Sequence, residues 1–319
     1  MGRSATNAVD FSSVSSMPSE HNSGYRGRLA PSPTGLLHVG HARTFWSAYQ
    51  RARDAQGALV LRMEDLDPQR SQTEFVQAAL EDLRWLGIRW QEGPDLPASA
   101  SSGDRGPYFQ SKRRSFYLAA WRRLYNRGAI YACRCSRKEL SQSATAPHED
   151  DEPIYPGTCR NNRSGPMQLG GHAVQMRELV EPNPNGINWR FRVPDGETIR
   201  FYDERMGPQQ FVAGEDFGDF LVWRRDDVPA YQLACVVDDA EMGITEVVRG
   251  ADLLKSTARQ ILLNRALGYS DPRWYHCELV TDHNGERLAK RHASLSLRAL
   301  RRRGVTPLKI FSADLPISE

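Results

Sequence analysis

The sequence predicts an α/β protein built on a doubly wound, mainly parallel sheet that carries one insertion. In the first third of the chain, short apolar runs alternate with amphipathic stretches of helical spacing, which is the pattern of strand–helix–strand units. A proline-rich stretch interrupts this pattern from Cys133 to about Phe211, and apolar runs resume after it. The length of 319 residues suffices for one large core or two modest ones.

The first predicted unit begins at residues 28–30, whose apolar character favours a short strand. The Pro/Gly run at 31–35 ends that strand, because proline removes ladder donors. A helix is expected next, ending near Gly57, and its buried face has the spacing i, i+3, i+4, i+7. That face comprises Ala42, Phe45, Trp46 and Tyr49. The apolar residues 58–63 then predict a buried parallel strand, joined by a right-handed crossover.

Further elements follow in order. Ser71 and Glu74 predict a capping box at the start of a second helix that ends at Gly87. A third helix is expected to end at Gly128. The predicted buried stripes of these two helices are Phe75, Ala79, Leu83 and Leu86, and then Tyr117, Ala120, Trp121 and Leu124. After the interruption, residues 221–223, 231–237 and 244–248 predict short strands, and residues 252–267 predict a helix.

Bulk properties limit the function classes. No apolar run approaches the roughly 18 residues that a bilayer-spanning helix needs, so no membrane partner is expected. The formal net charge of +3 does not require a nucleic-acid partner, although four arginines cluster at residues 298–303. A solvated tail would show the same cluster. Residues 1–24 are rich in Ser and Asn and lack an apolar signal region, so they predict a disordered leader.

Five cysteines, an odd number without a secretion signal, favour a reducing, cytoplasmic compartment over disulfides. Three of them cluster around a tyrosine, as Cys133, Cys135, Tyr155 and Cys159. Three thiolates and one phenolate would complete a tetrahedral zinc shell, which would be structural because no open position remains. Buried free thiols are the alternative on spacing alone. Cys235 and Cys277 are expected to be core or incidental residues.

The strongest chemical motif spans residues 30–41, which read APSPTGLLHVGH. A strand feeds a Pro/Gly turn that opens a helix, so His38 and His41 stand at a helix N-terminus that attracts phosphate. Gly40 would let a flat adenine lie against the backbone. A bare His-x-Gly-His favours a capped surface helix with incidental histidines. The preceding Pro-Ser-Pro-Thr-Gly run and the flanking strand–helix–strand unit favour ATP binding.

The chain resembles the class I aminoacyl-tRNA synthetases, specifically their glutamyl branch. The resemblance is carried in order by residues 30–41, by RMEDLD at 62–67, by YQLA through VDD at 231–239 with VRGAD at 248–252, and by RLAKR at 287–291. It implies the Rossmann-like nucleotide-binding fold of that class with an inserted, zinc-bearing, acceptor-like subdomain. We expect the catalytic domain in residues 25–132 and 213–319, and the insertion in 133–212.

The resemblance also implies an ATP site, with Mg²⁺, and a glutamate site. His38, His41 and Lys290 would be catalytic, and these three with Gly40 would bind ATP. Guanidinium groups bind carboxylates bidentately and a carboxylate can hold an ammonium, so the expected glutamate ligands are Arg28, Ser32, Glu64, Tyr231 and Arg249. Alone, each would more simply be a surface charge or a core-edge tyrosine. Arg287 and Ala289 depart from the usual lysine loop, which could also be a basic surface loop.

Within that branch, the cysteine pattern and the short chain after Lys290 resemble the glutamyl-Q tRNA(Asp) synthetases, which lack an anticodon-binding region. This resemblance implies transfer of glutamate from glutamyl-adenylate to the queuosine base of tRNA(Asp), by a monomer. Two alternatives remain: a truncated glutamyl-tRNA synthetase that charges tRNA(Glu), and a non-catalytic RNA-binding zinc protein. His148, between the halves of the zinc pattern, is a competing ligand candidate.

Overall fold

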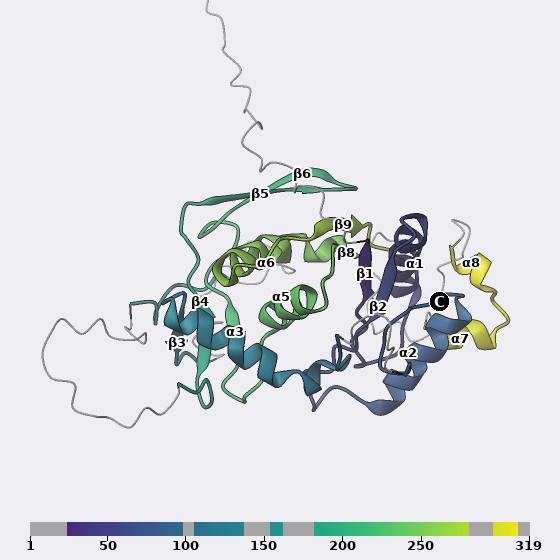
Figure 1. Ribbon diagram of the computed structural model, residues 1–319, viewed down its shortest axis with the longest axis horizontal. Coiled ribbons are helices and arrows are strands. Elements are labelled where there is room, and N and C mark those ends of the chain that lie inside the picture. The colour runs from purple at the N-terminus through teal and green to yellow at the C-terminus, as the bar shows by residue number, and fades with distance from the viewer. Residues whose placement is uncertain (1–23, 98–104, 137–153, 162–181, 281–295, 312–319) are drawn as a thin grey trace, which may run out of the picture.

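The computed structural model describes residues 24–97, 105–136, 154–161, 182–280 and 296–311. Three expectations lie outside these residues: the leader apart from its last position, His148, and the Lys290 loop. The described chain is elongated, with the N-terminal strands and first helix at one end and the predicted metal site at the other (Figure 1). Within the described residues, no helix combines the length and apolarity needed to cross a membrane.

The first unit consists of β1 (Arg26–Leu29), α1 (Val39–Asp54) and β2 (Ala58–Leu61), and the two strands pair in parallel as predicted. The buried face of α1 differs in part from the prediction. Trp46 and Tyr49 are only half-buried, and the contact that partly covers Trp46 is with Phe311 of the C-terminal chain, with ring centroids 4.4 Å apart. The fully covered face comprises Val39, Ala42, Phe45, Ala48 and Ala52.

Two helices continue the first half. α3 (Arg114–Asn126), which follows the short 3₁₀ turn η1 (Gln110–Lys112), buries the four residues predicted for it. For α2 (Thr73–Trp85) the predicted capping box is wrong, because the N-cap is Gln72 and its side chain makes no capping hydrogen bond. The Gln72 backbone N–H donates to the carbonyl oxygen of Pro33 at 3.0 Å. This bond keeps the chain extended one residue longer than the capping box requires.

An antiparallel sheet forms the end of the molecule opposite α1 (Figure 1). It contains β3 (Ile130–Cys133), β4 (Asn188–Phe191) and β7 (Leu221–Trp223), in that order. Residues 221–223 therefore form a strand, as predicted. Because β3 ends at Cys133, the register of this sheet fixes one end of the cysteine pattern.

A second sheet joins the two halves of the chain. Its order is β6 (Gly207–Val212), β5 (Thr198–Asp203), β9 (Arg273–Cys277) and β8 (Glu246–Gly250). β5 and β8 both run parallel to β9. Beside β8, the Thr245 N–H donates to the Arg26 carbonyl oxygen at 2.9 Å. The parallel strands β2, β1, β8 and β9 therefore lie near one another, and the predicted α/β class with a parallel sheet is confirmed.

One predicted strand is wrong. Residues 231–237 belong to a helix, α5 (Tyr231–Glu241), which packs beside the predicted helix α6 (Leu254–Leu267). The 3₁₀ turn η2 (Ala251–Leu253) directly precedes α6. Seven consecutive residues of α5, from Leu233 to Asp239, are buried. A helix buried on all sides shows no amphipathic period, so its apolar run cannot be distinguished from a buried strand by pattern.

Helix α5 also carries two buried carboxylates, Asp238 and Asp239. Asp238 accepts hydrogen bonds from Arg113 Nε (2.6 Å), Gln110 Nε2 (2.8 Å) and the Tyr117 hydroxyl (2.9 Å). The neighbouring carboxylate of Asp239 accepts from Arg62 Nη1 at 2.7 Å. These bonds join β2, η1, α3 and α5 through polar groups that need hydrogen-bond partners because they are buried away from water.

Two short helices end the described chain. Helix α7 (Leu297–Arg302) packs near α2, and α8 (Pro307–Phe311) packs near α1.

Replacing Asp238 by alanine should lower the free energy of unfolding by about 3–5 kcal/mol, because Arg113 would stay buried without its carboxylate. The matched control is Asp54→Ala, which removes the exposed ion pair with Arg53 (3.0 Å) and should cost less than about 1 kcal/mol. Urea unfolding of both variants measures the difference. Equal losses would contradict the structural role given to the buried pair.

Candidate active site

A cavity of about 360 Å³ opens where β1 and β8 end and where α1 and α5 begin. Eight of the nine residues predicted for ATP and glutamate line it, and the ninth, Lys290, lies outside the described residues. The eight come from four separate stretches of sequence, so folding assembles them. They are Arg28, Ser32, His38, Gly40, His41, Glu64, Tyr231 and Arg249.

The two histidines form the N-terminal cap of α1. His38 is the N-cap, and its Nδ1 accepts from the Gly40 N–H at 3.1 Å, while Nδ1 of His41 accepts from the His38 N–H at 3.2 Å. A neutral imidazole that accepts at Nδ1 carries its hydrogen on Nε2. Both rings therefore present an Nε2 donor, at a helix end whose dipole attracts anions. This arrangement is suited to a triphosphate.

Gly40 has a steric reason to be glycine. A Cβ at this position would lie 2.9 Å from Cε1 and 3.1 Å from Nδ1 of His38. The missing side chain therefore lets the His38 ring lie against the first turn of α1, with the two histidine ring centroids 3.8 Å apart. The predicted contact between Gly40 and adenine remains a prediction.

Alternating buried charges hold the two groups expected to bind the ends of glutamate. Arg28 Nη1 donates to the Val248 carbonyl oxygen at 2.8 Å, and its Nε lies 3.6 Å from an oxygen of Asp239. Asp239 also pairs with Arg62, whose Nη2 lies 3.4 Å from Glu64 Oε1. The cation Arg28 and the anion Glu64 thus face one cavity, and the Asp239–Arg62 ion pair connects them. An amino acid with a carboxylate and an ammonium matches this pattern.

The other predicted ligands lie on the same wall. Arg249 of β8 is buried and is hydrogen-bonded to side chains of α6 and β9. Tyr231 is the first residue of α5, and burial raises the pKa of its phenol well above the ordinary value. The hydroxyl therefore stays protonated and can donate a hydrogen bond. Ser32 lies in the loop that follows β1.

Sequence reasoning did not single out three cavity residues, Thr44, Asp252 and Glu278. It also missed a contact made by a predicted ligand. Cys235, expected to be a core or incidental residue, is buried and donates from Sγ to Glu64 Oε1 at 3.5 Å. Cys235 lies one helical turn after Tyr231. A helix assigned to residues 231–241 would therefore have placed Cys235 beside Tyr231 and so near the other predicted glutamate ligands. Asp252 ends the VRGAD motif at 248–252, which could have pointed to it, whereas no sequence signal distinguished Thr44 or Glu278.

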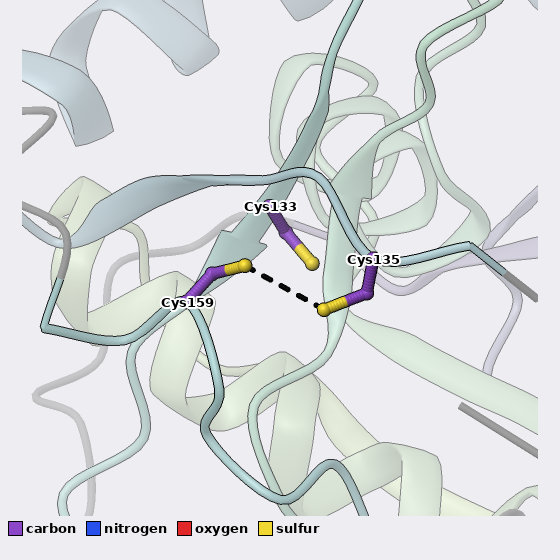
Figure 2. A group of neighbouring side chains, drawn as sticks. All are labelled: Cys133, Cys135 and Cys159. Atoms are coloured by element: carbon purple, nitrogen blue, oxygen red, sulfur yellow. Dashed lines mark hydrogen bonds between the residues drawn. The ribbon is translucent and has the colours of Figure 1, made fainter. Parts of the chain in front are cut away.

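The four residues predicted to bind metal converge at the far end of the molecule. The three sulfur atoms of Cys133, Cys135 and Cys159 lie within 4.8 Å of one another. Figure 2 shows the three side chains directed toward one another. The Tyr155 hydroxyl oxygen lies 3.5 Å from Cys133 Sγ and 3.4 Å from Cys135 Sγ. Sulfur ligands of one tetrahedral zinc are separated by about 3.8 Å, and Cys135 and Cys159 are 3.5 Å apart. The cluster therefore has the size and donor chemistry of a metal site.

A cation already adjoins this cluster. Arg190 Nε donates to Cys133 Sγ at 3.4 Å, and its guanidinium carbon lies 3.9 Å from the centre of the Tyr155 ring. Burial raises the pKa of the Cys135 thiol to about 11, whereas hydrogen bonds from neighbouring groups outweigh burial and lower the pKa of Cys159. A metal ion bound here would favour the thiolate of Cys135 against this effect of burial. Figure 1 places β3 and β4 away from β1 and α1, so this cluster is remote from the cavity.

Comparison with known proteins identifies the family. The family described as "tRNA synthetases class I (E and Q), catalytic domain" matches residues 25–314. The chain belongs to this family. It is therefore a ligase of the aminoacyl-tRNA synthetase type, in a family that uses ATP with Mg²⁺ and binds glutamate and tRNA.

Three relatives show where the chain lies within the class I synthetases. A "Glutamyl-Q tRNA(Asp) synthetase" of Nitratidesulfovibrio vulgaris is 47% identical over 288 residues, 89% of this chain and 83% of that protein. "Glutamate--tRNA ligase 2" of Nitrosococcus oceani is 44% identical over 281 residues, but the chain spans only 56% of it. The crystal structure of a glutamate tRNA ligase from Elizabethkingia meningosepticum, in complex with its amino acid, superposes with a TM-score of 0.69 at 30% identity, over 85% of this chain and 53% of that one.

Glutamate binding should weaken as the pH falls. The pH at which it weakens should lie above the ordinary pKa of a glutamate side chain. Burial raises the pKa of Glu64, and Arg62 and Arg28 oppose this effect only in part. Glu64 must be ionised to hold an ammonium, so the KM for glutamate should rise as the pH drops through the raised pKa. Steady-state kinetics of amino-acid activation between pH 8 and 5 measure this.

Glu64→Gln is the matched variant for that profile. It should raise the KM for glutamate by about tenfold or more, because a buried charge pair is lost, and it should remove the acidic limb. The KM for ATP should stay near the wild-type value. An acidic limb that persists unchanged in Glu64→Gln would assign the titration to another group.

Proposed function

We propose that this synthetase activates L-glutamate with ATP–Mg²⁺ and transfers the glutamyl group to the queuosine base of tRNA(Asp). The observation that carries the proposal is a single cavity that combines an imidazole-capped helix N-terminus with Arg28, Arg249 and Glu64. The 47% identity to a protein named for this reaction supports the choice of acceptor.

Activation would require positioning and charge neutralisation more than proton transfer. The α-carboxylate of glutamate is already ionised, so it attacks the α-phosphorus without a general base. A new P–O bond forms, the bond to the β-phosphate bridge breaks, and pyrophosphate leaves. The Nε2 donors of His38 and His41, together with the Lys290 ammonium, would stabilise negative charge on the phosphates. Bound Mg²⁺ would supply further neutralisation of the triphosphate.

Selection of glutamate follows from the charges in the cavity. We assign Arg28 and Arg249 to the carboxylates, Glu64 to the ammonium, and the hydroxyls of Tyr231 and Ser32 to additional hydrogen bonds. A neutral amide side chain would leave one guanidinium without its anion in a buried site, which is unfavourable. In the second step the bond between the glutamyl carbonyl and AMP breaks as the acceptor attacks, and AMP leaves.

Two assays test the reaction. We expect ATP–pyrophosphate exchange that depends on glutamate, and acid-gel labelling of tRNA(Asp) only when the tRNA contains queuosine. Labelling of tRNA(Glu) instead would support a glutamate–tRNA ligase, which the 44% identical relative also represents. No exchange with any amino acid would support a non-catalytic RNA-binding protein.

Lys290→Ala tests the role given to the basic loop. Loss of a cation that meets the triphosphate should lower the rate of exchange by about two orders of magnitude, and metal content should stay unchanged. Arg287→Ala is the neighbouring control, because Arg287 stands where the usual motif has a lysine that we do not assign to the transition state. Normal activation by Lys290→Ala would refute its assignment.

We further propose that the cysteine cluster binds one structural Zn²⁺ through Cys133, Cys135, Tyr155 and Cys159, within an inserted subdomain at residues 133–212. Two observations support it: the sulfur separations and the Tyr155 oxygen directed at two of the thiols. Four protein donors leave no position for substrate, so the ion would organise the chain around β3.

Metal analysis of purified protein should find about one zinc per chain, and Cys135→Ser should lose it because one of four donors is weakened. Cys277→Ser, which changes a buried cysteine of β9 outside the cluster, should retain it. Chelation should lower the Tm of the wild type more than that of Cys135→Ser. Full zinc content in Cys135→Ser would remove that residue from the ligand set.

A further inference from the structure

Among the described residues, three side chains accept hydrogen bonds from Arg249. Its Nε donates to Nε2 of His276 at 3.1 Å, its Nη1 to Gln260 Oε1 at 2.8 Å, and its Nη2 to Thr257 Oγ1 at 2.7 Å. A guanidinium has five N–H groups, so the described residues use three and two remain. Those two lie on a buried side chain that lines the cavity. Two N–H groups are what a carboxylate needs for a bidentate pair.

The bond from Arg249 Nε sets a condition on His276. Because the donor is Arg249, Nε2 of His276 must carry no hydrogen, and the ring must be neutral with its hydrogen on Nδ1. Asp203 meets this condition, since its Oδ2 lies 2.6 Å from Nδ1 of His276. Both side chains are fully buried, so water does not compete for either nitrogen.

Asp203 is itself held by the backbone as an acceptor. The N–H groups of Arg205 (3.1 Å) and Met206 (2.9 Å) donate to its Oδ1, and the His276 N–H lies 3.1 Å from its Oδ2. Although burial opposes ionisation, these bonds and the one from His276 keep the pKa of Asp203 below its usual value. Burial and then the charge of Arg249 lower the pKa of His276 to about 4. The aspartate is therefore charged and the imidazole neutral at neutral pH.

We propose that Asp203 and His276 are positioning residues for the amino-acid substrate: Asp203 fixes one tautomer of His276, which accepts from Arg249 and leaves two N–H groups of Arg249 for a substrate carboxylate. The proposal rests on the proposed function. Asp203 is the last residue of β5, inside the segment predicted as the insertion, and it is the point where β5 pairs with β9 opposite Trp274. The inserted segment thus takes part in amino-acid recognition, although Asp203 makes no contact with the cavity.

Asp203→Asn is the first test. The amide oxygen would stay with the Arg205 and Met206 N–H groups, so the amide NH₂ would face Nδ1 of His276. The imidazole would then shift its hydrogen to Nε2, where it opposes the Nε–H of Arg249. We expect the KM for glutamate in pyrophosphate exchange to rise about 10- to 100-fold, as for loss of a hydrogen bond to a charged group. The KM for ATP should stay within about twofold.

Two substitutions of His276 separate positioning from packing. The side-chain oxygen of His276→Gln lies three bonds from Cβ, as Nε2 does, so it restores an acceptor for Arg249. The polar atoms of His276→Asn lie two bonds from Cβ, like Nδ1, so that variant keeps the partner of Asp203 and leaves Arg249 Nε unpaired. We expect His276→Gln to retain most of the glutamate affinity and His276→Asn to lose it. Equal KM values for glutamate in the two variants would overturn the proposal.

Imidazole ¹⁵N NMR gives a readout that does not depend on turnover. Wild-type His276 should show a neutral ring with its hydrogen on Nδ1 at pH 7, and Asp203→Asn should show the hydrogen on Nε2. A wild-type ring protonated on Nε2 would refute the relay even in a fully active enzyme. If the wild type fails to activate glutamate, the proposed function is refuted, and the tautomer still decides whether Asp203 and His276 position Arg249.

Discussion

The cavity depends on the compensation of buried charge between α5 and the first two parallel strands. Arg28 and Arg62 point into a region almost closed to water, where an unpaired guanidinium would be strongly destabilising. Asp239 pairs with both cations, and the pairing of Arg62 extends to Glu64. A substrate carboxylate and ammonium therefore meet charges that are already fixed, so little reorganisation is needed on binding.

The same side chains serve folding and recognition at the start of α1. His38 and His41 satisfy backbone N–H groups of the first helical turn, which would otherwise lack partners. That capping role also fixes each ring with its hydrogen on Nε2. Serine and aspartate are common N-cap residues that would also satisfy these N–H groups, but neither would offer an imidazole N–H. The residue type at these two positions is therefore explained by phosphate chemistry better than by helix stability.

The cavity and the cysteine cluster lie at opposite ends of the molecule (Figure 1), and β5 runs from the central segment toward the cavity. The thiol cluster lies at the end of β3, away from the cavity (Figure 1), so a metal bound there would organise the chain without touching substrate. From the same central segment, β5 returns along β9 and brings Asp203 against His276. Because His276 accepts a hydrogen bond from Arg249, this contact connects the segment to Arg249. The proline-rich middle of the chain is thus structurally continuous with the catalytic half.

The sequence by itself determined the α/β class, the first strand–helix–strand unit, the residues that gather at the cavity, and the cysteine cluster. The class and the first unit follow from local periodicity, which is a property of the chain alone, whereas the cavity residues follow from ordered motifs that resemble those of a known family. Tertiary structure decided that residues 231–241 are helical, since full burial erases the amphipathic period. It also decided that Cys235 contacts Glu64 and that Asp203 reaches Arg249 through His276. These partners are separated by dozens of residues or more, and only packing in a water-poor interior makes their hydrogen bonds obligatory.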